Sequence, residues 1–257
     1  MKSILAAHFL IVLLFAISCT GICQDASCYF DNLGGKLASS SNLSEAMDLF
    51  NKSLDQNQSN DGAWVHKGNV QRAMKNCDPS IESYNQAIRL DQGNKAAWSG
   101  IIEAYTLKKD YDNATVAADQ IIRLDPRNKA NWLKRGTILQ IRGEFENASS
   151  DFDHALTLDA NYKDAIYRKA LSELSANRTT QAIELLDRII ALDSKYKNAY
   201  NAKGLALEIS GDYENAIASY DKALKIDETW SLAQINKIHA LMAAGRQRDA
   251  VDILLRV

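Results

Sequence analysis

The sequence predicts an all-α fold, a solenoid of antiparallel helix pairs, and three observations support this. Only 2 of the 257 residues are proline, which favours long uninterrupted helices because proline interrupts most regular structure. Three of the four tryptophans, Trp64, Trp98 and Trp132, lie 34 residues apart. The same spacing governs the chain after residue 26, and repeats of roughly 20–50 residues are typical of solenoids, whose units bury apolar faces against their neighbours.

Composition restricts the class of protein. The chain has 30 basic and 32 acidic side chains, a net charge of −2, and 46% hydrophobic residues. These values fit a soluble globular protein rather than a disordered one. A nucleic-acid-binding protein normally shows a basic surplus or stripe, so we expect no nucleic-acid partner.

Residues 1–23 are predicted to be a signal peptide. Lys2 precedes an apolar run that ends near Ile17, and small residues follow it. A positive start, an apolar stretch and a small-residue exit are typical of secretory signals. Cleavage after Cys23 leaves a short mature segment, residues 24–26, ahead of the repeats.

Two alternatives for this segment remain. The stretch 4–22 has the length needed to span a bilayer, about 17–25 residues, and a retained segment would anchor the protein in the membrane. The run Ala16-Ile17-Ser18-Cys19 resembles a lipoprotein processing site, with Cys19 as the lipidated residue. Each interpretation takes the bulk of the chain out of the cytoplasm. We therefore expect an exported protein, secreted or associated with the cell surface or envelope, that touches a membrane only through this segment.

The repeat array is predicted to occupy residues 27–257. Seven blocks align without insertion or deletion, six of them complete and the last one short; they start at residues 27, 61, 95, 129, 163, 197 and 231. Position 4 of a block is bulky in all but the last. Position 8 is mostly small: Gly34, Gly68, Gly136, Ala170 and Gly204, with Ile102 and Ile238 as exceptions. Position 20 is Ala in every block except at Ser80. Small residues at positions 8 and 20 let two helices approach closely, and bulky residues fill the remaining space.

Local signals divide each block into two helices. A break is expected near position 15, where Gly143, Gly211 and Gly245 suit a left-handed helix end. Asp78 and Pro79 predict the start of a second helix, with Asp78 capping its free amides. Between blocks, Leu124-Asp125-Pro126 provides a stop, and its acidic position recurs at Asp91, Asp159, Asp193 and Asp227.

These residues resemble the tetratricopeptide repeat family. The block from Lys197 carries the family's preferred residue types at Tyr200, Gly204, Leu207, Ala216, Tyr220 and Ala223. The resemblance covers residues 27–257 and is weakest in the block from Lys163 and in the last block. It implies a right-handed superhelix whose first helices line a concave surface, and a non-catalytic protein–protein interaction scaffold.

No catalytic or metal-binding constellation is evident. The histidines outside the N-terminal segment, His66, His154 and His239, lie in three different blocks, so no two of them have the helical spacing of a metal site, and no cysteine lies within four residues of any of them. No glycine-rich phosphate loop occurs, since Gly34 and Gly35 fall inside a repeat helix. We therefore expect no enzymatic activity and no cofactor.

The family's concave surface corresponds here to positions 2, 5, 6, 9, 12 and 13. The resemblance places a mixed set of candidate binding residues on it: Asn69, Arg72, Glu103, Lys134, Thr137, Gln140, Tyr167, Arg168, Asn201 and Glu208. Lys134 and Arg168 share position 6 of adjacent blocks and favour an acidic ligand. No lysine occurs at position 5, where relatives that bind the acidic C-terminus of a chaperone need one, so that class of co-chaperone is disfavoured.

The sequence also contains a surplus of glycosylation sequons. Their asparagines are Asn42, Asn51, Asn57, Asn113, Asn147 and Asn177, whereas chance predicts about two. Part of the surplus follows from the repeat, which places a polar residue before the alanine at position 20. The surplus is nevertheless consistent with an exported protein that carries surface glycans.

The C-terminal end is expected to be a second contact surface. The chain stops at Val257, early in the last second helix, and a solenoid end normally needs a polar cap. We therefore expect Ile238, Leu241, Leu254 and Leu255 to form an apolar edge suited to self-association or to docking a partner.

From the sequence we expect a scaffold that binds a peptide or partner helix in the concave groove. The alternative is a membrane-anchored or lipidated assembly factor for an envelope complex. The mature N-terminus distinguishes them.

Overall fold

The computed structural model describes residues 26–40 and 42–255, which form fourteen α-helices and no strand. The expected signal segment and Cys19 lie outside the described residues. None of the described helices is both long and apolar enough to cross a membrane.

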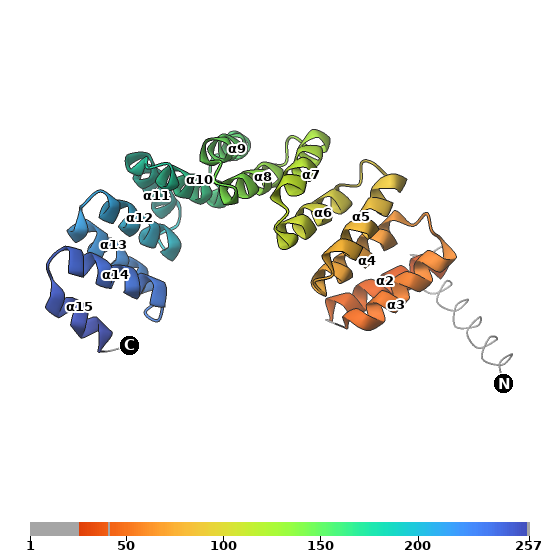
Figure 1. Ribbon diagram of the computed structural model, residues 1–257, viewed down its shortest axis with the longest axis horizontal. Coiled ribbons are helices and arrows are strands. Elements are labelled where there is room, and N and C mark those ends of the chain that lie inside the picture. The colour runs from red at the N-terminus through yellow and green to blue at the C-terminus, as the bar shows by residue number, and fades with distance from the viewer. Residues whose placement is uncertain (1–25, 41, 256–257) are drawn as a thin grey trace. The chain divides into compact units, whose positions relative to one another are not determined.

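The chain divides into two compact units, with the boundary between Leu124 and Asp125. In each unit, consecutive helices form antiparallel pairs, and each pair packs on the next (Figure 1). The helices of the first unit are α2 (Ala26–Ser39), α3 (Leu43–Gln56), α4 (Asp61–Ala73), α5 (Cys77–Leu90), α6 (Lys95–Lys108) and α7 (Tyr111–Leu124). Those of the second are α8 (Lys129–Ile141), α9 (Phe145–Leu158), α10 (Lys163–Ser175), α11 (Thr179–Leu192), α12 (Lys197–Ile209), α13 (Tyr213–Ile226), α14 (Ser231–Ala243) and α15 (Gln247–Leu254). This is the all-α stack of helix pairs that the sequence predicts.

In four of the described helix pairs, an aromatic ring of the second helix packs directly on a glycine of the first helix. Phe50 of α3 is almost fully buried, and a Cβ added at Gly34 of α2 would lie only 2.7 Å from its ring. The same contact joins positions 8 and 24 in three other blocks, as Gly68–Tyr84, Gly136–Phe152 and Gly204–Tyr220. Glycine at position 8 is therefore selected by the ring it supports, because a Cβ there has no space.

In two other blocks, a different pair of residues fills the space between positions 8 and 24. In α10 and α11, Ala170 faces the smaller Leu186, and both side chains are fully buried in one cluster. In α6 and α7, Ile102 occupies position 8 and Ala118 occupies position 24; both are buried. Volume conserved across a pair of positions is what close packing requires, which explains why Ile102 is tolerated where glycine is usual.

The turn between paired helices is left-handed. Gly143, Gly211 and Gly245 have φ values of 81°, 80° and 75° at position 15, as the sequence predicts. Lys75, Lys109 and Asn177 hold the same position with φ values of 62–63°. A side chain in this conformation costs about 1–2 kcal/mol, which glycine avoids.

We therefore expect Lys109→Gly to raise the free energy of unfolding by about 1 kcal/mol. The control is Lys52→Gly in the interior of α3, which should lower it by about the same amount because glycine disfavours an ordinary helical position. Thermal or urea unfolding of both variants measures the difference. If both variants are destabilised alike, the turn conformation at Lys109 carries no strain.

Two sequence predictions are wrong. Asp78 is not a cap, because α5 begins one residue earlier, at Cys77, with Asn76 at its N-cap; Asp78 lies in the first turn and pairs with Lys108 at 2.5 Å. The C-terminal apolar edge does not include Ile238 and Leu241, which are buried in a cluster with residues of α13 and α15. The eight-residue α15 is long enough to cover them, and its own Leu254 and Leu255 stay 59% and 80% exposed.

Candidate binding surface

Within each of the two units, the first helices of neighbouring pairs contact each other. We define the first-helix face as positions 2, 5, 6, 9, 12 and 13 of each block, carried by α2, α4 and α6 in the first unit and by α8, α10, α12 and α14 in the second. Side chains at positions 5 and 6 of adjacent blocks meet along it. Asp31 Oδ1 lies 2.8 Å from His66 Nδ1, and Asn236 donates to Asn201 at 3.0 Å. The same 35-residue step thus joins neighbouring helices in both units.

In the first unit this face carries a group of polar side chains that contact one another. Arg72 Nη2 lies 3.1 Å from Glu103 Oε2. The Tyr84 ring belongs to the core, but its hydroxyl donates to Asn69 Oδ1 at 2.7 Å and accepts from Arg72 Nε at 3.4 Å. Burial raises the pKa of Tyr84, so the hydroxyl remains a donor. Three of the predicted binding residues, Asn69, Arg72 and Glu103, are therefore brought together and fixed to the core.

His66 was not among the predicted binding residues, but it has a defined partner. Its hydrogen bond to Asp31, together with the charge of that carboxylate, raises the pKa of His66 above 6.5 despite burial. Because the folded-state pKa is raised, the stabilising contribution is complete below about pH 6.5 and is lost as the pH rises through the folded value.

We expect Asp31→Asn to lower the pKa of His66 and to remove that loss of stability with rising pH. The effect on the free energy of unfolding should stay below about 1 kcal/mol, since 45% of the His66 side chain is exposed and solvent screens the pair. A proton NMR titration of the imidazole measures the pKa directly. An unchanged His66 pKa in the variant would show that Asp31 does not govern it.

In the second unit the polar residues of the face are fixed in a similar way. Gln140 donates to the Arg168 carbonyl and to Ser172 Oγ, each at 3.0 Å. Tyr220 donates to Glu208 Oε2 at 3.0 Å, and burial followed by the Glu208 charge raises the pKa of Tyr220. The Arg168 side chain is exposed and makes no ion pair within residues 125–255. It is the cation of this face most open to a ligand.

The remaining predicted residues divide by their contacts. Thr137 donates its hydroxyl to the Leu133 carbonyl of its own helix. The Tyr167 ring packs against Tyr196, with centroids 5.6 Å apart, and burial raises the pKa of Tyr167. Lys134 is half-buried on α8. These three side chains therefore shape the face, whereas the Asn201 amide is bonded to Asn236 on the next first helix.

An apolar patch on α12 and α14 is the main feature that sequence reasoning missed. Its side chains are between 40% and 56% exposed: Leu205, Ile209, Leu232, Ile235 and Met242. They occupy positions 9, 13, 2, 5 and 12, and α12 contacts α14 directly. Single exposed apolar residues are ordinary, but a group on one face indicates an interaction site. The pattern was visible in the sequence once positions on the face were compared for apolar rather than polar residues.

The sequon asparagines are accessible to different degrees. Asn57, Asn113, Asn147 and Asn177 are exposed, whereas Asn42 and Asn51 are half-buried. The amides of Asn113 and Asn147 donate to Asp110 and Glu144, three residues earlier. Glycosylation stays a prediction, and the four exposed asparagines are its best candidates.

Comparison with known proteins identifies the repeat. Residues 61–94 and 167–229 each match a family model of the tetratricopeptide repeat. The segment 61–94 coincides with one of the 34-residue blocks. No curated protein matches the sequence.

Solved structures share the fold at low identity. A tetratricopeptide repeat protein from Parabacteroides merdae ATCC 43184 superposes with a TM-score of 0.73 at 14% identity, over 90% of this chain and 91% of that chain. PilW, described as a widely conserved type IV pilus biogenesis factor, gives 0.67 at 18% identity, over 76% and 91%. YrrB, described as having an unusual peptide-binding site, gives 0.60 at 20% identity, over 73% and 97%.

Proteins built from this repeat are generally non-catalytic scaffolds. Among residues 26–40 and 42–255, no three His, Cys, Asp or Glu side chains gather in a way that could hold a metal ion. The 34-residue blocks, the ring-on-glycine cores and the two matched segments agree on one assignment. Residues 61–94 and 167–229 are tetratricopeptide repeats, and the described chain shares the fold of solved proteins built from this repeat.

Proposed function

We propose that this protein is a non-catalytic scaffold of the cell envelope or exterior that binds a peptide or helix of a protein partner on its first-helix face. The fold itself suggests protein or peptide partners. The observation that carries the finer proposal is the apolar patch of α12 and α14, which offers a partner five partly exposed aliphatic side chains on two adjacent helices.

The surroundings of the patch favour a specific, low-cost contact. Asn201 and Asn236 bridge α12 and α14 at 3.0 Å, and each helix is held by its own core contacts. A surface that is already ordered loses little conformational freedom on binding, so more of the contact energy appears as affinity. YrrB, with its described peptide-binding site, is one similar structure that makes a peptide ligand reasonable for such a stack.

The basic residues of the same face suggest that the ligand also carries an acidic residue. Arg168 is exposed on α10 and Lys134 lies on α8, both at position 6. A partner segment with apolar residues for the patch and an acidic residue for Arg168 would match this face of the second unit.

The experiment is a pull-down from native envelope or medium, using the wild-type chain and a Leu205→Asp/Ile235→Asp variant. We expect the partner to be lost with this variant, because burying an unpaired carboxylate in an apolar contact is strongly unfavourable. Val116→Asp on α7 is the control, since Val116 is apolar, 58% exposed and on a second helix. Retention of the same partner by the double variant would refute the proposal.

A second comparison tests the charged end. Lys134→Glu/Arg168→Glu should weaken capture of the same partner without changing the helical content of the chain. If the charge reversal leaves binding intact, the acidic part of the ligand is elsewhere or absent.

Export is part of the proposal and is tested by the mature N-terminus. Sequencing of protein from its native host should give Gln24 for a released scaffold. Lipidated Cys19 or an intact Met1 would instead support the membrane-attached assembly factor. Mass analysis of the same sample detects glycans on the six sequon asparagines.

A further inference from the structure

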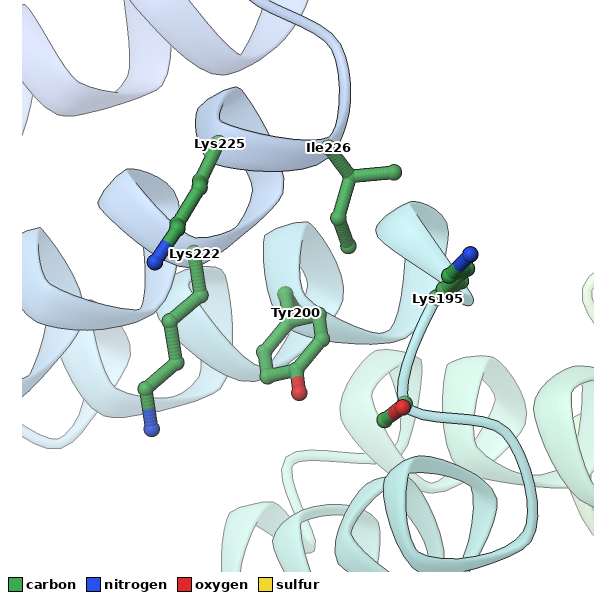
Figure 2. Close-up of a pocket in the computed structure, with 6 residues that line it drawn as sticks. Lys195, Tyr200, Lys222, Lys225 and Ile226 are labelled. Atoms are coloured by element: carbon green, nitrogen blue, oxygen red, sulfur yellow. The ribbon is translucent and has the colours of Figure 1, made fainter.

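A hollow of about 460 Å³ lies between α12 and α13, away from the first-helix face. Its lining residues come from the loop before α12, from the N-terminal half of α12 and from the end of α13: Ser194, Lys195, Tyr200, Lys222, Lys225 and Ile226. Figure 2 shows the Tyr200 ring between Lys222 and Lys195, with Lys225 and Ile226 on the neighbouring helix. Small-molecule sites typically have volumes of about 300–1,000 Å³.

Position 4 is tyrosine in the block that carries the hollow. In the three tryptophan blocks, the indole N–H donates to the carbonyl six residues earlier and ties the preceding loop to the helix: Trp64 to Gln58, Trp98 to Gln92 and Trp132 to Pro126, at 2.8–3.0 Å. Gln234 makes the same bond to Glu228. Tyr200 makes no such bond to Ser194, and its hydroxyl has no hydrogen-bond partner among the residues that the structure describes. Tyr200 therefore leaves unused the loop carbonyl that the tryptophan N–H binds in other blocks, and its smaller side chain fills less of the space beside the loop.

The lysines of the hollow differ from other lysines of the second unit. At position 1 of three blocks, Lys129, Lys163 and Lys197 pair with Asp159, Asp193 and Asp227 of the same block. At position 7, Lys169, Lys203 and Lys237 pair with Asp153, Asp187 and Asp221 of the preceding helix. Lys195, Lys222 and Lys225 form no ion pair within residues 125–255.

The carboxylates beside the hollow are already engaged. Asp193 binds Lys163 and accepts the backbone N–H of Lys195, and Lys163 is the main cause of its lowered pKa. Asp227 and Asp221 bind Lys197 and Lys237. Lys222 Nζ lies 5.9 Å from the centre of the Tyr200 ring. Lys195, Lys222 and Lys225 thus line the hollow together with one aromatic ring, and the charge of Lys195 also contributes to the lowered pKa of Asp193.

We propose that this hollow binds a phosphate monoester carried on a small ring, such as a sugar phosphate. A phosphate monoester has a charge of about −1.5 to −2 at pH 7, which suits three lysines better than the single charge of a carboxylate. Lysine is a frequent phosphate ligand because its ammonium is a compact point charge. The phosphate group alone does not fill the volume, so the ring it carries packs beside Tyr200 and Ile226, with the Tyr200 and Ser194 hydroxyls available to its hydroxyl groups.

Titration calorimetry of the full chain tests the ligand class with glucose 6-phosphate, glucose, glucuronate and inorganic phosphate. We expect glucose 6-phosphate to bind at least about tenfold tighter than each of the others, and more weakly as salt concentration rises. Equal affinity for glucuronate would contradict the argument that the three lysines prefer the doubly charged phosphate to a singly charged carboxylate. Equal affinity for inorganic phosphate would show a site for the free ion and contradict the ring contact.

Three variants test the site. Lys222→Ser/Lys225→Ser should weaken glucose 6-phosphate binding about tenfold or more, whereas Lys52→Ser, which changes an exposed lysine at the same position 26 of the first block, should not. Tyr200→Trp should abolish binding by filling the hollow, with an unchanged or higher Tm because the indole N–H can reach the loop carbonyl. Undetectable binding to the wild-type chain, or binding that survives in both hollow variants, would overturn the proposal.

Discussion

Phe50→Ala should lower the free energy of unfolding by about 3–5 kcal/mol, the usual cost of deleting a buried ring. Phe50 is almost fully buried in a cluster with Ala46 and Val70, and its ring lies on the backbone of α2 at Gly34. Urea unfolding followed by circular dichroism measures the loss.

A matched change separates burial from residue type. Leu90→Ala removes a large apolar side chain that is 45% exposed at the end of α5, so it should cost markedly less. Equal losses in the two variants would mean that the ring-on-glycine contact is not the centre of the repeat core.

Gly34→Ala and Gly35→Ala should change stability in opposite directions although the residues are neighbours in α2. A Cβ at Gly34 would lie 2.7 Å from the Phe50 ring, whereas one at Gly35 meets nothing within 4 Å. We expect Gly34→Ala to cost about 1–3 kcal/mol through overpacking. Gly35→Ala should add about 0.5–1 kcal/mol, since alanine loses less entropy than glycine in a helix.

The cause can be checked by combining two changes. In the Phe50→Ala background the ring is gone, so Gly34→Ala should no longer destabilise and the two effects should be strongly non-additive. Additive losses would place the cost of Gly34→Ala somewhere other than the Phe50 ring.

The sequence was sufficient for the architecture because the repeat imposes it locally. Small positions 8 and 20 and the break at position 15 are properties of one helix pair, and each recurs often enough to be recognised. Ile102 was an exception in the sequence but not in the structure, since Ala118 at position 24 supplies the compensating small residue.

Details that depend on one residue's neighbours were less predictable. Asp78 has the right type for a cap but lies one residue inside α5, where Asn76 holds the capping position. Ile238 and Leu241 were expected to be exposed because α15 was expected to be too short to cover them.

Contacts between blocks were the hardest to foresee. His66 looked isolated because its partner, Asp31, is 35 residues away, and only stacking of the first helices brings them together. The hollow at Tyr200 lies where the position-4 side chain makes no bond to the loop before it, and no sequence motif describes this. The lysines at positions 1 and 7 form ion pairs with aspartates in the structure. Only this comparison shows that the three lysines of the hollow differ from them.

The most direct test of the proposed function is site-specific photo-cross-linking in the native host. A photoreactive phenylalanine analogue at residue 235 lies in the apolar patch, and one at residue 218 lies on the exposed side of α13. We predict that residue 235 cross-links to one discrete protein partner and that Leu205→Asp abolishes the product, while residue 218 gives none. A partner captured at residue 218 but not at residue 235 would contradict binding on the first-helix face.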